Sequence, residues 1–532
     1  MKVAAVLVPS AVLLALVQIG HAPHDPLAVA RASRTVVNHE ASVPPQCYTR
    51  TAGVANPCWT CHTVPRAPNH MDDSDLQREY AFSDFARTNR WTNLFVDRSA
   101  AIAATSDDEI LKWIRSDNYE ALVASMRTAK DYEGYRPDLD LARGFDADGF
   151  AVDGSEWRAL RYKPFPGTFW PTNGSVGDVF VRLPHAFRAD ADGRPSRAVH
   201  RANFALLEAV LCADPDAPDE ALDRRIEPID EREVGADVDG DGAIDGVVER
   251  IHRLPTRYLG GARDVVVQRY VFPEGTEFLH SLRYVDPDAP WRVAQRLKEL
   301  RYMRKVLELD AWGMQRAYER EIDEKLAGRI PTPAGSATSG LRGRFGWQLQ
   351  AWIEDAHGRL RLQTDEEHRA CMGCHGALGV TADHTFAFAR KVPGRDGWRQ
   401  QDLRSMPDAP QSGHTDPETL TWFRRVGGGD EFRANDEVRA RFWRDSVLDE
   451  AEVRRAAIGG DRDLLHLVAP SRDRALRLAK AYLAIVREQS FTKGRDAVLG
   501  PIVDVFERID TETTGLGERD LVFRDGRLWL RW

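Results

Sequence analysis

Apolar residues recur every three or four positions along much of the chain, and this spacing places them on one face of a helix. Residues 197–212 are the clearest case, because Val199, Phe204, Leu207 and Leu211 fall on one side of such a helix. The same pattern predicts further helices, one that begins at the capping box Ser106–Glu109 and others over 293–326, 417–425, 435–457 and 471–489.

Runs of strand-forming residues alternate with these helices. The runs 265–272 and 277–285 flank a short Pro/Gly turn, which predicts a hairpin. Residues 347–363 predict a second hairpin, and residues 521–530 predict a third. The segment 331–343 is rich in Pro, Gly, Ser and Thr and predicts a linker or mobile loop. The chain is therefore expected to have an α+β fold that is mainly helical, with a β-rich central insertion.

The N-terminus has the pattern of an export signal. Lys2 precedes an apolar run, Val3 to Ile19, that is shorter than the roughly 20 residues a membrane-spanning helix needs. Ala28-Val29-Ala30 fits the small-residue cleavage rule, whereas Gly20-His21-Ala22 is a poorer option because Pro23 follows it. We expect a signal peptide over residues 1–30 and a periplasmic or secreted protein with no membrane span. An uncleaved N-terminal anchor is the alternative.

Composition limits the function without defining it. The chain has 532 residues, of which 42% are hydrophobic and 29% charged, as in ordinary globular proteins. The formal net charge of −9 argues against binding to nucleic acid, which needs clustered cations. Six cysteines are too few for a disulfide scaffold, so their placement matters more than their number.

Four of the six cysteines stand in two Cys-x-x-Cys-His motifs. The first is Cys58, Cys61 and His62, and the second is Cys371, Cys374 and His375. In this motif the two thiols attach to one haem and the adjacent His ligates its iron. A thioredoxin-type or zinc-binding pair of cysteines is the alternative reading, but neither explains a His after each pair. The motifs predict two covalently bound haem c groups.

Residues 57–62 and 371–376 resemble the haem-binding segments of bacterial di-haem c-type cytochromes. The resemblance includes a distant likeness to di-haem peroxidases and MauG-like enzymes at the motifs only, because 313 positions separate Cys58 from Cys371. The segments around Asn56 and Gly427-Gly428-Gly429-Asp430 resemble those of large secreted di-haem proteins. The resemblance implies a cytochrome c-like haem region at each end of the chain. The expected regions are 31–160 and 291–500 for the haems, 161–290 for the β-rich centre and 501–532 for a tail.

The residue on the other side of each iron determines what such a haem does. His70 and His384 are candidates for the distal ligands, since each follows one of the motifs closely. His368 lies three residues before Cys371, while His280 and His466 stand in apolar strand and helix patterns and are expected to be core residues.

The centre of the chain contains an Asp/Gly-rich loop. Asp237, Asp239, Asp241 and Asp245 alternate with small residues, and Gly242 supplies a sharp turn. Alternating carboxylates can converge on a hard cation, so the loop predicts a structural calcium site. A metal-free turn is the alternative, and it is the preferred reading for the two similar Asp-Ala-Asp-Gly segments at 146–149 and 190–193.

Cys47 and Cys212 lie outside the motifs. In an oxidising compartment they could form a disulfide, and the alternative is two free thiols. The sequence leaves both possibilities open.

Three functions fit these features. The first is an exported di-haem cytochrome that transfers electrons to a redox partner protein or a small donor or acceptor. The second is a peroxidase-like oxidoreductase in which one open haem acts on a small ligand. The third is a haem-bearing subunit of a larger redox complex. No catalytic residue can be isolated from spacing alone.

Overall fold

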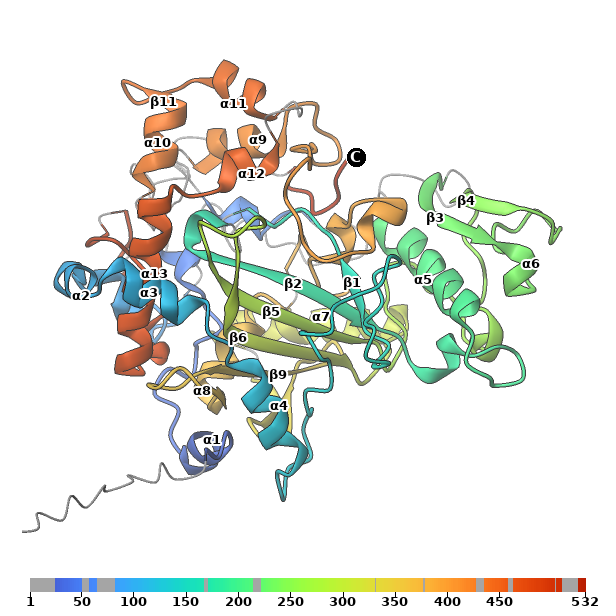
Figure 1. Cartoon of the computed structure of the whole chain (residues 1–532), viewed down its shortest axis with the longest axis horizontal. Helices are drawn as coiled ribbons and strands as arrows, with labels where there is room; N and C mark the ends of the chain where they lie inside the picture. The colour runs from blue at the N-terminus through green and yellow to red at the C-terminus, as the bar shows by residue number, and fades with distance from the viewer. Residues whose placement is uncertain are drawn as a thin grey trace, which may run out of the picture.

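A computed structural model describes most of the chain (Figure 1). The described residues are 24–49, 57–64, 82–166, 171–213, 222–330, 332–376, 378–426, 435–457, 463–502, 504–509 and 525–532.

The centre of the molecule is an antiparallel sheet of eight strands in the order β1-β2-β5-β6-β9-β8-β7, with β10 paired to β9. Its strands are β1 (Arg158–Leu160), β2 (Ser175–Arg182), β5 (Glu277–Val285), β6 (Val293–Lys305), β7 (Ala334–Ser336), β8 (Gly340–Arg342), β9 (Trp347–Glu354) and β10 (Leu360–Leu362). The other strands form two small hairpins, β3 (Arg224–Asp230) with β4 (Val247–Ile251) and β11 (Trp443–Arg444) with β12 (Val447–Leu448).

The sheet is covered on both faces, because successive side chains of a strand point to opposite sides. In β2, Val179 and Val181 pack in one hydrophobic cluster, and Phe180 between them packs in another. In β5, Phe278 and Leu279 divide between the same two clusters. The sheet therefore separates two cores.

Helices surround the sheet in groups (Figure 1). They are α1 (Ala28–Ala32), α2 (Ser99–Ala104), α3 (Asp107–Ile114), α4 (Tyr119–Arg127), α5 (Arg197–Cys212), α6 (Glu231–Val234), α7 (Ala311–Leu326), α8 (Asp365–Met372), α9 (Glu418–Val426), α10 (Asp436–Phe442), α11 (Glu450–Ala457), α12 (Leu464–Val468) and α13 (Arg472–Glu488). Helices α9 to α12 share a core of their own above the sheet, and α3 and α13 close one end of it. At the other end, α5 packs against β3, and the β3–β4 hairpin with α6 forms a lobe.

The expectation of a mainly helical fold is wrong, because the eight-stranded sheet is the organising element. Strands β2 and β9 are buried on both faces, so the two-residue alternation that identifies a half-exposed strand is hidden in them.

The predicted helix over 293–326 is the main local error, since β6 and α7 occupy this range. Charged residues inside β6 produced a misleading polarity pattern. Lys298 and Lys305 are buried, and their ammonium groups bind the Gly174 carbonyl at 2.7 Å and the Asp383 carboxylate at 2.6 Å. A charged residue that is buried with a partner cannot be distinguished, from the sequence pattern, from one at an exposed position.

The predicted hairpin of 265–272 with 277–285 is also wrong, because β5 pairs with β2 and β6 instead. The predicted helix over 435–457 is divided into α10, the β11–β12 hairpin and α11. Two short strands, β7 and β8, occupy part of the expected linker at 331–343.

Several local predictions are confirmed. Helix α5 has the predicted bounds, and α9 and α13 agree with theirs within a residue. Helix α3 begins where Ser106 accepts a hydrogen bond from the Glu109 amide at 3.1 Å. The hairpin over 347–363 is β9 with β10. The third predicted hairpin falls partly outside the described residues, and its described arm pairs with Gln411 through Leu530.

Candidate metal and cofactor sites

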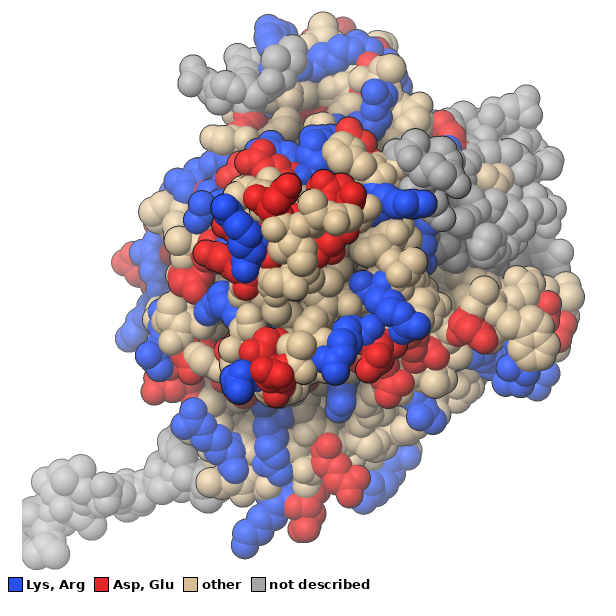
Figure 2. All heavy atoms as spheres, turned by 90° about the vertical axis from the view of Figure 1, so that its right-hand side faces the viewer, with Lys and Arg blue, Asp and Glu red and all other residues tan. Residues whose placement is uncertain are grey.

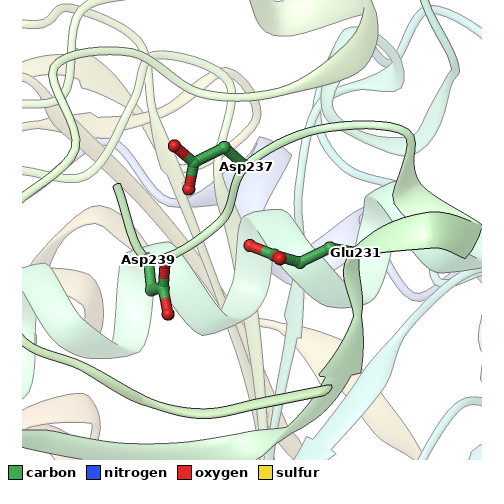
Figure 3. Close-up of side chains that lie close together, drawn as sticks. All are labelled: Glu231, Asp237 and Asp239. Carbon is green, nitrogen blue, oxygen red and sulfur yellow. The ribbon is translucent and has the colours of Figure 1, made fainter. Parts of the chain in front are cut away.

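Three carboxylates converge in the lobe formed by β3, β4 and α6 (Figure 3). One oxygen atom from each of Glu231, Asp237 and Asp239 lies within 4.8 Å of the others. Glu231 is the first residue of α6 and is buried, whereas the two aspartates are half-buried in the loop that follows. We call this group the acidic cluster.

Backbone amides fix the side chains of the cluster in place. The Val238 amide donates to Glu231 Oε1 at 2.6 Å, which ties the loop to the start of α6. The amides of Gly240 and Gly242 donate to the two carboxylate oxygens of Asp237 at 2.7 and 2.8 Å. Gly242 has φ +92°, so the sharp turn predicted for it is present.

Sequence reasoning found two of the three members. Asp241 and Asp245 are exposed and lie outside the cluster of three, although the Asp245 amide faces Glu231 Oε2 at 3.4 Å. Glu231 was missed because it precedes the loop, at the end of the incoming strand β3. An acid just upstream of an Asp/Gly-rich loop is the signal that could have identified it.

The electrostatics of the cluster favour a cation. Burial raises the pKa of Asp239, and the negative charges of Asp241, Glu231 and Asp237 raise it further. Oxygen-only ligands of this kind suit a hard cation such as calcium, which accepts carboxylate, carbonyl and water oxygens.

The two Asp-Ala-Asp-Gly segments are turns, as expected. Asp146 Oδ1 accepts hydrogen bonds from the amides of Asp148 and Phe150 at 3.0 and 2.9 Å. Asp190 Oδ1 accepts from Asp192 and Arg194 in the same way, at 2.9 Å each. In both segments one Asp closes the turn.

The second Cys-x-x-Cys-His motif is held by α8 and the loop after it. A capping box at Thr364 and Glu367 starts α8, and Arg361 binds the Glu367 carboxylate through two nitrogens at 2.9 and 2.8 Å. Burial raises the pKa of Cys374 to about 11, and the neighbouring Cys371 adds to this effect. The thiol therefore stays protonated at neutral pH, unlike a reactive redox cysteine.

His375 has an ordered ring. Its Nδ1 lies 2.9 Å from the carbonyl oxygen of His384, and this carbonyl can only accept, so Nδ1 carries the hydrogen. Nε2 is then the nitrogen left to bind a metal, which is the arrangement that metal-ligating histidines usually have. The ring of His384 stacks on Phe345 with centroids 3.9 Å apart. The backbone carbonyl of His384 therefore lies on the Nδ1 side of the His375 ring, opposite the Nε2 that is left to bind a metal.

The two motifs meet the same N-terminal segment, residues 37–48. The carboxylate of Glu366 in α8 accepts hydrogen bonds from the amides of Val37 and Asn38 at 2.8 and 3.0 Å. Cys47, in the same segment, lies close to both motifs. Burial raises its pKa first, and the nearby thiols of Cys58 and Cys374 raise it further. Motifs 313 positions apart in the sequence thus both lie near Cys47.

A buried histidine that the sequence assigned to the core lies near the second motif. His280 in β5 has its pKa lowered to about 3, by burial first and also by the charges of Arg301 and His375. Arg301 is its cross-strand neighbour in β6 and also lies near the thiols of Cys371 and Cys374. The strand pairing, rather than any sequence motif, brings His280 to this place. His70, the other predicted distal ligand, is outside the described residues.

Cys47 and Cys212 are both free thiols in the structure. Cys212 is buried, and its sulfur lies 2.9 Å from the carbonyl oxygen of Phe388. Burial raises the pKa of Cys212 to about 11. Cys47 packs in a different hydrophobic cluster, so the two are not joined by a disulfide here.

The face of the molecule seen in Figure 2 carries Lys and Arg side chains mixed with Asp and Glu. Neither sign dominates this face. Such a surface does not form the broad basic footprint that nucleic-acid binding needs.

Comparison with known proteins identifies the family. A family model described as "-like lipoprotein" matches residues 30–435, which is more than half of the chain. An uncharacterized lipoprotein of Aquifex aeolicus (strain VF5) is 31% identical over 525 residues, and the match covers 86% of each chain. No solved structure matches the chain. The chain therefore belongs to this lipoprotein family.

This membership corrects the resemblance to di-haem c-type cytochromes, because the family model and the curated relative are both lipoproteins. Three predicted functions depended on this resemblance and are wrong for the same reason. They are an electron-transfer cytochrome, a peroxidase-like oxidoreductase and a subunit of a redox complex. The family match gives no support to the descriptions cytochrome c, haem protein and electron transfer.

A lipoprotein family agrees with the predicted export of the chain. Among the described helices, none is both long enough and apolar enough to cross a membrane.

Proposed function

We propose that this exported protein is a calcium-binding protein, with the acidic cluster of Glu231, Asp237 and Asp239 as its site. The observation that carries the proposal is the approach of three carboxylate oxygens to within 4.8 Å. Like charges held this close repel one another, and a divalent cation converts the repulsion into attraction.

Calcium at this site would have a structural role. The cluster connects the first turn of α6 to the loop before β4, so a bound ion would fasten the hairpin of the lobe at one end. Carboxylates without His or Cys favour calcium over zinc.

The test is the thermal midpoint of the folded protein with calcium and with a chelator. Calcium should raise the midpoint, because a ligand that binds only the folded state stabilises it. Glu231→Gln and Asp239→Asn should each reduce this increase, while Asp192→Asn, in an exposed turn, should leave it unchanged. An equal increase in the wild type and in Glu231→Gln would refute the site.

We also propose that each Cys-x-x-Cys-His motif attaches haem c. Cys58, Cys61 and His62 would hold one group, and Cys371, Cys374 and His375 the other. The Nε2 of His375, which the hydrogen bond of Nδ1 leaves available, and the adjacent thiol of Cys374 support this assignment. The group would supply an iron atom, and the proposal includes no electron-transfer or peroxidase activity.

Haem attachment is tested in a host that assembles haem c. The purified protein should retain haem after denaturation, and Cys61→Ser or Cys374→Ser should each remove about half of it. Cys212→Ser is the matched control, since this thiol lies outside both motifs and should leave the haem content unchanged. Wild-type protein without covalent haem would contradict the assignment.

We also propose that the exported protein is periplasmic and that it carries no lipid on Cys47. Cys47 is half-buried and lies near the thiols of Cys58 and Cys374. Labelling with a radioactive fatty acid should leave the protein unlabelled. Label that disappears in Cys47→Ser would contradict this location.

A further inference from the structure

The residues around the predicted cleavage site are part of the folded molecule. Residues 24–32, which include α1, lie along β10 and are called the strap below. Sequence pattern alone predicts that a signal peptidase cuts after Ala30, in the middle of this segment.

The strap completes the edge of the central sheet. Strand β10 pairs with β9 on one side only, and the strap covers the other side. The Leu362 amide donates to the Pro26 carbonyl at 2.8 Å, and the His24 ring nitrogen Nε2 lies 2.9 Å from the Leu360 carbonyl. These are backbone groups that an uncovered strand edge would leave without a protein partner.

The strap also buries apolar surface. Leu27 is 1% exposed and Ala30 is 7% exposed, and both pack in the cluster that contains Leu360 and Leu362. Val29, which lies between them in the sequence, is 45% exposed. This division into a buried and an exposed face is typical of a helix that belongs to the fold.

The far end of the strap is held by Arg31. Its guanidinium donates to the carbonyl oxygens of Lys130 and Asp131 at 2.5 and 3.0 Å, in the loop after α4. The strap therefore joins two elements, β10 and the loop after α4, that are more than 200 positions apart in the sequence.

We propose that residues 24–32 stay in the mature protein, so that the export leader ends before His24 and is not cut after Ala30. A cut after Ala30 would remove the side chain of Leu27, the carbonyl of Pro26 and the ring of His24 together. Strand β10 leads directly through Thr364 into α8 and the second motif, so the strap supports the segment that holds Cys371.

The N-terminus of the exported protein tests the proposal directly. Intact mass and N-terminal sequencing of protein recovered from the periplasm or membrane should give a start at His24 or upstream of it. An uncut leader also agrees with retention of the strap. A start at Arg31 would overturn the proposal.

A second experiment tests whether the fold uses the strap. Leu27→Asp in the full chain should lower the thermal midpoint by about 2–6 °C, whereas Val29→Asp should leave it within about 1 °C. Equal midpoints for the two variants would overturn the structural role, even if sequencing found a start before His24.

Discussion

At the scale of single residues, burial keeps several histidines neutral. The pKa is lowered to about 4 for His200, His368 and His375 and to about 3 for His280 and His384, with burial as the first cause in each case. The hydrogen bonds of His368 require a neutral ring. Its Nε2 accepts a hydrogen bond from the Ala351 amide at 2.9 Å, so Nδ1 carries the hydrogen toward the Thr364 carbonyl. A proton on Nε2 would break the bond to Ala351.

These shifts predict instability in acid. An unfolded histidine binds its proton near pH 6.5, while the folded one resists until about pH 4, so the unfolded state binds more protons in this window. The free energy of unfolding should therefore be highest above pH 6.5 and fall as the pH drops toward 4. His368 alone should contribute on the order of 3 kcal/mol to the fall.

Chemical denaturation at a series of pH values measures this effect. His368→Gln should be less stable at pH 7 and should show a shallower decline between pH 6.5 and 4. His252→Gln, at an exposed position, is the control and should follow the wild type. A wild-type free energy that does not change across this window would disprove the account.

At the scale of elements, side chains at the ends of helices decide where the helices begin. The Thr364 hydroxyl accepts from the Glu367 amide at 3.3 Å, and the Glu367 carboxylate accepts from the Thr364 amide at 2.8 Å. This box fixes the first turn of α8 and so the direction in which the second motif leaves the sheet. Signals of this kind are local, which is why the starts of α3 and α5 could be predicted.

Removing the cap should weaken α8. Thr364→Ala should lower the free energy of unfolding by about 1 kcal/mol, since an N-cap hydroxyl satisfies an amide that the helix leaves open. Thr128→Ala, at an exposed position after α4, should change it by less than about 0.5 kcal/mol. Denaturant titration of both variants measures the difference, and equal losses would contradict the role of the cap.

At the scale of the whole molecule, close backbone contacts join distant parts of the chain. A Cβ atom added to Gly373, inside the second motif, would lie 1.8 Å from the Ser42 carbonyl oxygen. Only a residue without a side chain fits at this distance. Gly373 therefore allows the N-terminal segment to lie against the motif.

Gly373→Ala should separate these two segments. The clash cannot be relieved by rotating a side chain, because the obstacle is backbone, and we expect a loss of about 1–3 kcal/mol in the free energy of unfolding. Gly500→Ala is the matched control, since an added Cβ there meets nothing within 4 Å. Equal stability of the two variants would show that Gly373 is not required for the contact.

The candidate sites could be predicted only in part. Asp237 and Asp239 were found because they stand two positions apart in one loop, but Glu231 was not, because its part in the site depends on the turn from β3 into α6. His280 was taken for a core residue, and only the pairing of β5 with β6 places it near Arg301 and His375. The family was misjudged because a few short segments, chiefly the two five-residue motifs, carried the resemblance, while the family match extends over residues 30–435.

The sequence by itself determined the features that depend on neighbouring residues: the two Cys-x-x-Cys-His motifs, the Asp/Gly-rich loop, and the helices whose caps and apolar faces lie within one segment. The tertiary structure alone decided the eight-stranded sheet, the approach of both motifs to Cys47 and the contact of the strap with β10. The physical reason is the range of the interactions. Caps and turns satisfy amides a few positions away, whereas strand pairing and burial join residues hundreds of positions apart, and a local pattern contains no record of those partners.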